Sequence, residues 1–100
     1  MLLVRDIFYC KPGKVRAMVD KFKAIRKLDT AGMFGKARIL TDLSGERYWT
    51  VISEVEVESL DAFMKMGQEG DELSKQMGKI MEGYHDLVEK GRREIFTVEA

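Results

Sequence analysis

The chain has 100 residues, of which 45% are hydrophobic and 34% charged, with 17 Lys and Arg against 17 Asp and Glu. This length predicts one domain, residues 1–100, with the composition of a folded protein. Zero net charge argues against nucleic acid and acidic membranes as partners, since both attract clustered positive charge. The single cysteine excludes an internal disulfide and a cysteine-based zinc site.

The cellular compartment is inferred from the same features. The opening MLLV is an apolar run of only four residues before Arg5, too short for a signal peptide or a membrane span. Together with the lone Cys10, this predicts a protein of the reducing cytoplasm with no membrane contact.

A strand and a helix are the first predicted elements. Residues 2–10 (LLVRDIFYC) are rich in β-branched and aromatic types and apolar at both odd and even positions, which is typical of a central strand covered on both faces. Pro12 and Gly13 then break the strand. Apolar residues at helical spacing predict an amphipathic helix from Val15 to Leu28, followed by a glycine-containing loop over residues 29–35.

A β-hairpin is predicted next, with strands over residues 37–43 and 47–57 joined by a turn at 44–46 (SGE). Strand alternation sorts the side chains into two faces. One face is expected to hold Ile39, Thr41, Leu43, Tyr48, Thr50, Ile52 and Glu54. The other is expected to hold Arg38, Leu40, Asp42, Trp49, Val51, Ser53 and Val55. A buried Glu54 needs a charged or hydrogen-bonding partner, and Arg5 and Arg38 could serve if the strand register puts them on the same face as Glu54.

The last third of the chain predicts two helical segments and a strand. Ser59 is placed to cap a helix that Gly67 and Gly70 interrupt. A longer apolar stripe follows at helical spacing and predicts a helix that ends near Gly91. Its members are Leu73, Met77, Ile80, Met81, Tyr84, Leu87 and Val88. Residues 94–99 (EIFTVE) alternate and predict a closing strand.

The resulting order, β-α-β-β-α-β, predicts an α+β, ferredoxin-like fold: a four-stranded antiparallel sheet with both helices on one face. In the first and third strands, large apolar side chains occupy both odd and even positions and so point to both faces of the sheet. Because the helices cover only one face, the apolar side chains on the other face would be exposed to solvent in a monomer. We therefore expect a homodimer assembled through the open face that bears Tyr48, Thr50, Ile52 and Glu54.

The pattern resembles the dimeric α/β-barrel superfamily, which includes NIPSNAP-like and antibiotic-biosynthesis-monooxygenase-like proteins. The segments that carry the resemblance are DIFYCKPGKVRAMVDKF, EVEVESLDAFMKM and LVEKGRREIFTVEA. The resemblance implies homodimers whose two sheets form a barrel. It also implies one of several activities: cofactor-independent oxygenation, heme degradation, or none that is known.

Four residues are candidates for lining a ligand pocket between the sheet and the helices: Trp49, Ser53, Tyr84 and His85. Trp49 would form an apolar wall, while the other three could orient a hydrophobic or aromatic ligand. The alternative is that Trp49 fills the core and that methionines occupy the space. His85 could serve as a heme ligand or general base, or lie at the rim in solvent.

The pattern predicts neither a metal site nor a cofactor, because no acidic residue pairs with His85 at metal-ligand spacing. Phosphate-loop, dinucleotide and nucleophile-elbow motifs do not occur in the sequence. Three hypotheses remain open. The chain is a dimeric module that binds a small hydrophobic or aromatic molecule, a cofactor-independent monooxygenase-like enzyme, or a heme-binding protein that depends on His85.

Overall fold

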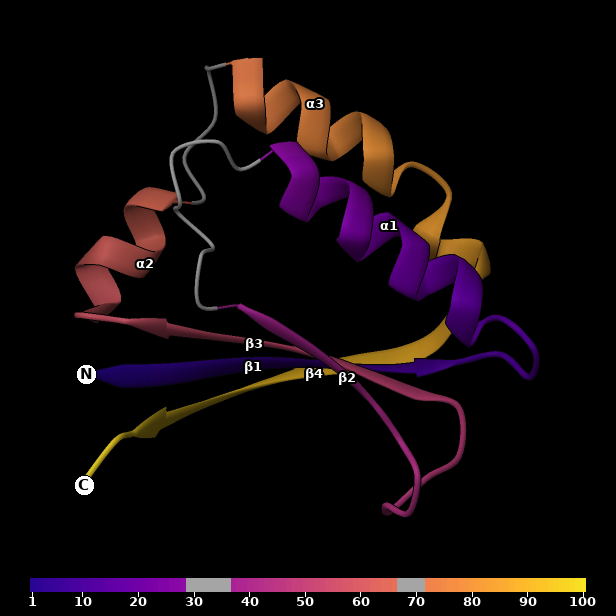
Figure 1. Cartoon of the computed structure of the whole chain (residues 1–100), viewed down its shortest axis with the longest axis horizontal. Helices are drawn as coiled ribbons and strands as arrows, with labels where there is room; N and C mark the ends of the chain where they lie inside the picture. The colour runs from indigo at the N-terminus through magenta and orange to yellow at the C-terminus, as the bar shows by residue number, and fades with distance from the viewer. Residues whose placement is uncertain (29–36, 67–71) are drawn as a thin grey trace.

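The structure is a computed structural model that describes residues 1–28, 37–66 and 72–100, apart from the side chains of Met66 and Leu73. Four antiparallel strands form one sheet in the order β2-β3-β1-β4. Their bounds are Leu2–Cys10 for β1, Arg38–Thr41 for β2, Thr50–Val57 for β3 and Val88–Thr97 for β4. The helices lie on one side of this sheet (Figure 1), so the predicted ferredoxin-like α+β fold is confirmed.

The central strand β1 pairs along its length with both neighbours. Opposite Arg5, for example, stand Glu54 of β3 and Glu94 of β4. Because side chains alternate between faces along a strand, this register assigns every residue of the sheet to the helix side or to the open side. The prediction that β1 is a central strand is therefore correct.

Helix α1, Val15–Leu28, has the bounds that its apolar spacing predicts. It packs on the sheet through Met18 and Val19, which form the core with Cys10 and Val51. Met18 and Val51 are fully buried, at 0% exposure. Around this core lie partly buried residues from all parts of the chain. They are Phe8, Val15, Phe22, Ile39, Met81, Tyr84, Leu87 and Val88.

Two helices follow β3. Helix α2 spans Leu60–Met66, and Ser59 caps it as predicted, because the Ser59 Oγ accepts a hydrogen bond from the Ala62 amide at 3.1 Å. Helix α3 spans Glu72–Met81 and packs beside α1. The predicted interruption at Gly67 and Gly70 lies outside the described residues, as do the predicted loop over 29–35 and the side chain of Leu73.

The end of the long apolar stripe differs from the prediction. The helix stops at Met81, not near Gly91, because Gly83 adopts φ 80°, a left-handed conformation that ends helices. A short 3-10 helix, Tyr84–Asp86, follows, and β4 begins at Val88. The predicted closing strand is therefore confirmed, but its bounds differ: it begins six residues before Glu94 and ends at Thr97. Pairing with the full length of β1 extends β4 and supplies its backbone hydrogen bonds.

The hairpin also differs from the prediction. Strand β2 ends at Thr41 and β3 starts at Thr50, so an eight-residue connection, 42–49, replaces the expected three-residue turn. Ile39 pairs with Ser53 and Thr41 with Val51, which puts them on the helix side. Arg38 and Leu40 share the open side with Glu54 and Ile52. The face assignment was thus correct within β3 and inverted for β2, because Thr41 stands opposite Val51 and not opposite Thr50 or Ile52, and a shift of one residue exchanges the two faces.

Candidate functional site

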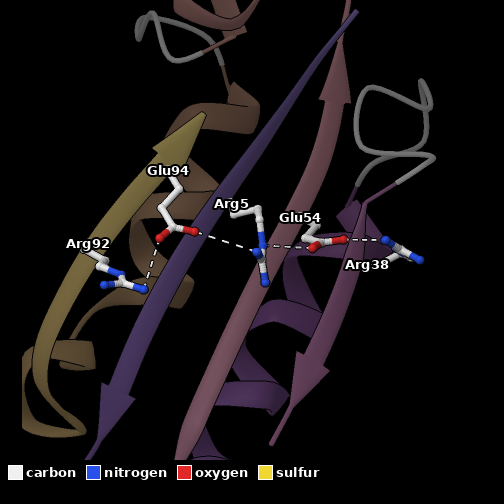
Figure 2. Close-up of polar contacts among 5 residues, drawn as sticks. All are labelled: Arg5, Arg38, Glu54, Arg92 and Glu94. Carbon is white, nitrogen blue, oxygen red and sulfur yellow. Dashed lines mark hydrogen bonds and ion pairs between the residues drawn. The ribbon is translucent and has the colours of Figure 1, made fainter. Parts of the chain in front are cut away.

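Charged side chains cross the middle of the open sheet face in a single row. Figure 2 shows its members from one edge of the sheet to the other: Arg92 and Glu94 of β4, Arg5 of β1, Glu54 of β3 and Arg38 of β2. Positive and negative groups alternate along this charged row. The last four are cross-strand neighbours, and Arg92 lies two residues before Glu94 in β4, so the strand register itself brings the opposite charges together.

Ion pairs connect the charged row. Arg92 Nη2 lies 3.0 Å from Glu94 Oε2, and Arg5 Nη1 lies 3.7 Å from Glu94 Oε1. Arg5 Nε lies 3.0 Å from Glu54 Oε2, while Arg38 Nη2 donates to Glu54 Oε1. The buried Nε–H of Arg5 is not aligned for a hydrogen bond, so its contact with Glu54 is chiefly electrostatic. The predicted partnership of Glu54 with Arg5 and Arg38 is confirmed.

Glu54 is the most buried member of the row, with only 6% of its surface exposed. A carboxylate at such a position requires compensating charge, because removing an unpaired charge from water costs several kcal/mol. Arg5 is half-buried and Arg38 is exposed, so both cations keep part of their hydration while they compensate Glu54. The two arginines therefore allow the Glu54 carboxylate to be buried at the centre of the open face without a layer of apolar residues above it.

Beside the charged row lies a cavity of about 380 Å³. Its floor consists of open-face side chains, among them Ile7, Tyr9 and Ile52, and its wall is the connection 42–49. Leu40 and Leu43 add apolar surface, while Arg5, Arg92 and Glu94 bring the charged row to its edge. The volume and the mixture of apolar surface with a few polar groups are those of a small-molecule site.

Tyr9 lies at the base of the cavity and is buried. The Arg47 guanidinium lies over its ring at 4.4 Å from the centroid, and Arg92 lies at 5.9 Å. Both distances fit cation–π attraction. Arg47 also pairs with Glu89 at 3.4 Å. Two guanidinium groups thus frame the aromatic floor of the cavity.

The four residues predicted to line a pocket on the helix side come from three parts of the chain: the connection before β3, β3 itself and the 3-10 helix. Ser53 is half-buried in β3 and faces the helices, as predicted. Tyr84 packs edge-on against Phe8 at 6.4 Å between ring centroids. His85 is exposed and stacks on Tyr84 at 4.0 Å. Tyr84 and His85 therefore lie together, while Met18 and Val51 fill the core beneath the helices.

Trp49 does not belong to β3, contrary to the prediction of a mid-strand residue. It precedes the strand, has φ 63° and is 44% exposed. Together with Val15, Thr41, Asp42 and Tyr48 it lines a second cavity, of about 410 Å³. The positive φ rotates Trp49 out of the strand alternation, so the facing predicted for Val51 and Ser53 holds while that predicted for Trp49 does not.

Sequence reasoning missed the open-face cavity and the roles of Tyr9, Arg47 and Arg92. Tyr9 lies four residues after Arg5 in β1, so strand alternation alone predicts that both side chains point to the open face. The position of the Arg47 side chain over Tyr9 could not be predicted in this way, because it depends on the path of the connection 42–49.

Other polar groups have structural partners. Arg93 makes a two-pronged contact with Asp6, at 2.6 and 3.3 Å, and this hydrogen bonding raises the pKa of Arg93. Arg93 also lies 4.9 Å from the Phe63 ring centroid.

Burial raises the pKa of the Cys10 thiol, which makes it a poor nucleophile at neutral pH.

Within residues 1–28, 37–66 and 72–100, no three His, Cys, Asp or Glu side chains gather closely enough to hold a metal ion. Among the helices of the described part of the chain, none has the length and apolar character to cross a bilayer.

Comparisons with known proteins agree with the fold. No family profile and no curated protein sequence matches the chain. Among solved structures, it is similar to an uncharacterized NIPSNAP domain protein from Burkholderia xenovorans, with 15% identity and a TM-score of 0.66 over 100% of this chain and 96% of that one. A NIPSNAP family protein from Agrobacterium tumefaciens has 15% identity and a TM-score of 0.72, over 96% and 90% of the two chains.

An antibiotic biosynthesis monooxygenase is also similar, with 11% identity and a TM-score of 0.68 over 100% of both chains. The resemblance found in the sequence is thereby confirmed at the level of the fold: the chain has the ferredoxin-like fold of NIPSNAP-like and monooxygenase-like proteins. Identities this low establish the fold alone.

Proposed function

We propose that the protein is a homodimer whose open sheet faces pack together, and that it binds a small hydrophobic or aromatic molecule between them. The observation that carries this proposal is the cavity of about 380 Å³ on the open face. Its apolar side chains suit a ring system, and the arginines at its edge suit a polar substituent. This moves the proposed ligand from the helix side of the sheet to the open side.

The dimer is tested first, by light scattering at micromolar concentration. Ile52 belongs to the open face, so Ile52→Lys would place an unpaired charge in the proposed contact and yield a monomer. Met64→Lys is the matched control, because Met64 is exposed on α2. A wild-type protein that scatters as a monomer would contradict the proposal.

The ligand site is tested with 1-naphthoate, which combines an aromatic ring with an anionic group. We expect it to raise the melting temperature of the wild-type protein. Leu40→Trp should abolish this effect by filling the cavity, since Leu40 lines it and is half-buried. Leu60→Trp, on exposed α2, serves as the control. An unchanged shift in Leu40→Trp would place the site elsewhere.

Cofactor-independent oxygenation is the second candidate function, favoured by the similarity to a solved antibiotic biosynthesis monooxygenase. An oxygen electrode with 1-naphthol as the probe tests it: enzyme-dependent oxygen uptake supports an oxygenase, and a rate equal to that of buffer opposes it. The heme hypothesis rests on His85 alone. A hemin titration in which His85→Ala gives the same Soret band as the wild type would reject it.

A further inference from the structure

The connection 42–49, here called the arm, projects from the open side of the sheet. Figure 1 shows it below the strands, on the side opposite the helices. Six of its residues line the open-face cavity. They are Asp42, Leu43, Ser44, Gly45, Glu46 and Arg47. A molecule that occupies this cavity must therefore contact the arm.

Several polar contacts hold the arm in this position. The Thr50 amide donates to Asp42 Oδ1 and the Thr50 hydroxyl donates to the Arg47 carbonyl, both at 2.8 Å. The Arg47 side chain returns to the sheet, over Tyr9 and beside Glu89. At the junction with β3, Trp49 adopts a positive φ that directs the chain away from the strand. The arm is thus anchored at both ends.

Despite these anchors, the arm presents large apolar side chains to solvent. Leu43 is 99% exposed and Tyr48 is 82% exposed. Because the ends of the arm are fixed to the sheet, a partner that packs against the arm would bury Leu43, which is otherwise fully hydrated. The opposite end of the open face has a second apolar group, formed by Leu3 and its cross-strand neighbour Phe96, which is 46% exposed.

These two groups lie at opposite ends of one face. Along β1, Leu3 lies six residues before Tyr9, which Arg47 of the arm covers, and this distance is about 20 Å. A twofold axis that lies between the two faces and runs perpendicular to β1 would bring the arm of each copy over the far end of the other. The same apolar contact would then form twice in the dimer. A second copy of this chain satisfies this arrangement because it supplies both groups at the required spacing.

We propose that the arm is a dimer clasp: Leu43 of each copy packs against the partner's Leu3 and Phe96. Because Leu43 also lines the cavity, the partner's Phe96 completes the cavity wall, and the ligand site is whole only in the dimer. This inference rests on the proposed homodimer and adds the segment that forms it.

The test uses one variant at each end of the face. Leu43→Asp and Phe96→Lys should each raise the dimer dissociation constant at least tenfold in sedimentation experiments, because each places a charge in an apolar contact. Leu60→Asp, at a residue that is 52% exposed on α2, should leave the constant unchanged. Leu43 makes little contact within its own chain, so Leu43→Asp is expected to fold normally.

Mixing the two variants sharpens the test. One copy carrying Leu43→Asp and one carrying Phe96→Lys would form a heterodimer with one native contact and one new ion pair, so the mixture should dimerise better than either variant alone. If the wild type is a dimer but neither variant weakens it, or if mixing gives no rescue, the clasp is wrong while the proposed dimer stands. A monomeric wild type would overturn both.

Discussion

The two faces of the sheet are built from alternate residues of the same strands, yet they are stabilised by different forces. On the helix side, Val4 and Val51 are buried in the apolar core, as is Met18 of α1. On the open side, the same two strands place Arg5 opposite Glu54. The helix side is completed within the chain by apolar burial, whereas the open side combines buried apolar residues such as Ile7 with lateral ion pairs. The two faces should therefore respond differently to substitution.

The largest effect is expected on the helix side, from Met18→Ala. Met18 is fully buried, so its truncation leaves a cavity and should lower the free energy of unfolding by about 2–5 kcal/mol. Urea denaturation measures this loss. Met64→Ala, at an exposed position of α2, should change it by less than about 0.5 kcal/mol. Equal losses in the two variants would contradict the assignment of the core.

A smaller effect is expected at the centre of the charged row, from Glu54→Gln. The substitution leaves Arg5 and Arg38 without their shared carboxylate, and we expect a loss of about 1–3 kcal/mol, as for hydrogen bonds to charged groups. The same denaturation experiment applies, with exposed Glu58→Gln as the control. A stability equal to that of the control would mean that Glu54 is well solvated and that the open face is polar throughout.

The smallest effect is expected at the arm, from Arg47→Ala. This change removes the contact over Tyr9 and the exposed ion pair with Glu89, for a loss of about 0.5–1 kcal/mol. Iodide should also quench Trp49 more readily, because the arm loses its attachment to the sheet. Lys23→Ala, on the exposed side of α1, is the control. Unchanged quenching would show that the backbone hydrogen bonds of Thr50 suffice to hold the arm.

The sequence allowed the helix side to be predicted better than the open side. Apolar spacing identified α1 at its observed bounds, because one continuous helix produces one continuous stripe. The same rule failed after Met81, since Tyr84 and Leu87 reach the same core from a 3-10 helix and from the residue beyond it. Apolar periodicity indicates which residues are buried, but it does not indicate that the backbone between them changes from an α-helix to a 3-10 helix at Gly83.

Prediction of the candidate site succeeded in part for a related reason. Parity within β1 and β3 sufficed to pair Arg5 with Glu54, since both strands are long and regular. The cavity could not be foreseen, because its wall is the arm, whose length and path depend on where β2 ends and on the positive φ of Trp49. Neither property follows from residue types alone.

The strand order has a consequence for how this protein avoids aggregation. It leaves β4, a strand of ten residues, at the edge of the sheet. A long exposed edge offers its backbone groups to any unfolded chain that can add another strand. Five of those ten residues are charged: Glu89, Lys90, Arg92, Arg93 and Glu94. A strand that paired with this edge would have to remove water from these charges, which is unfavourable. The charged residues of β4 therefore disfavour the addition of further strands to the sheet.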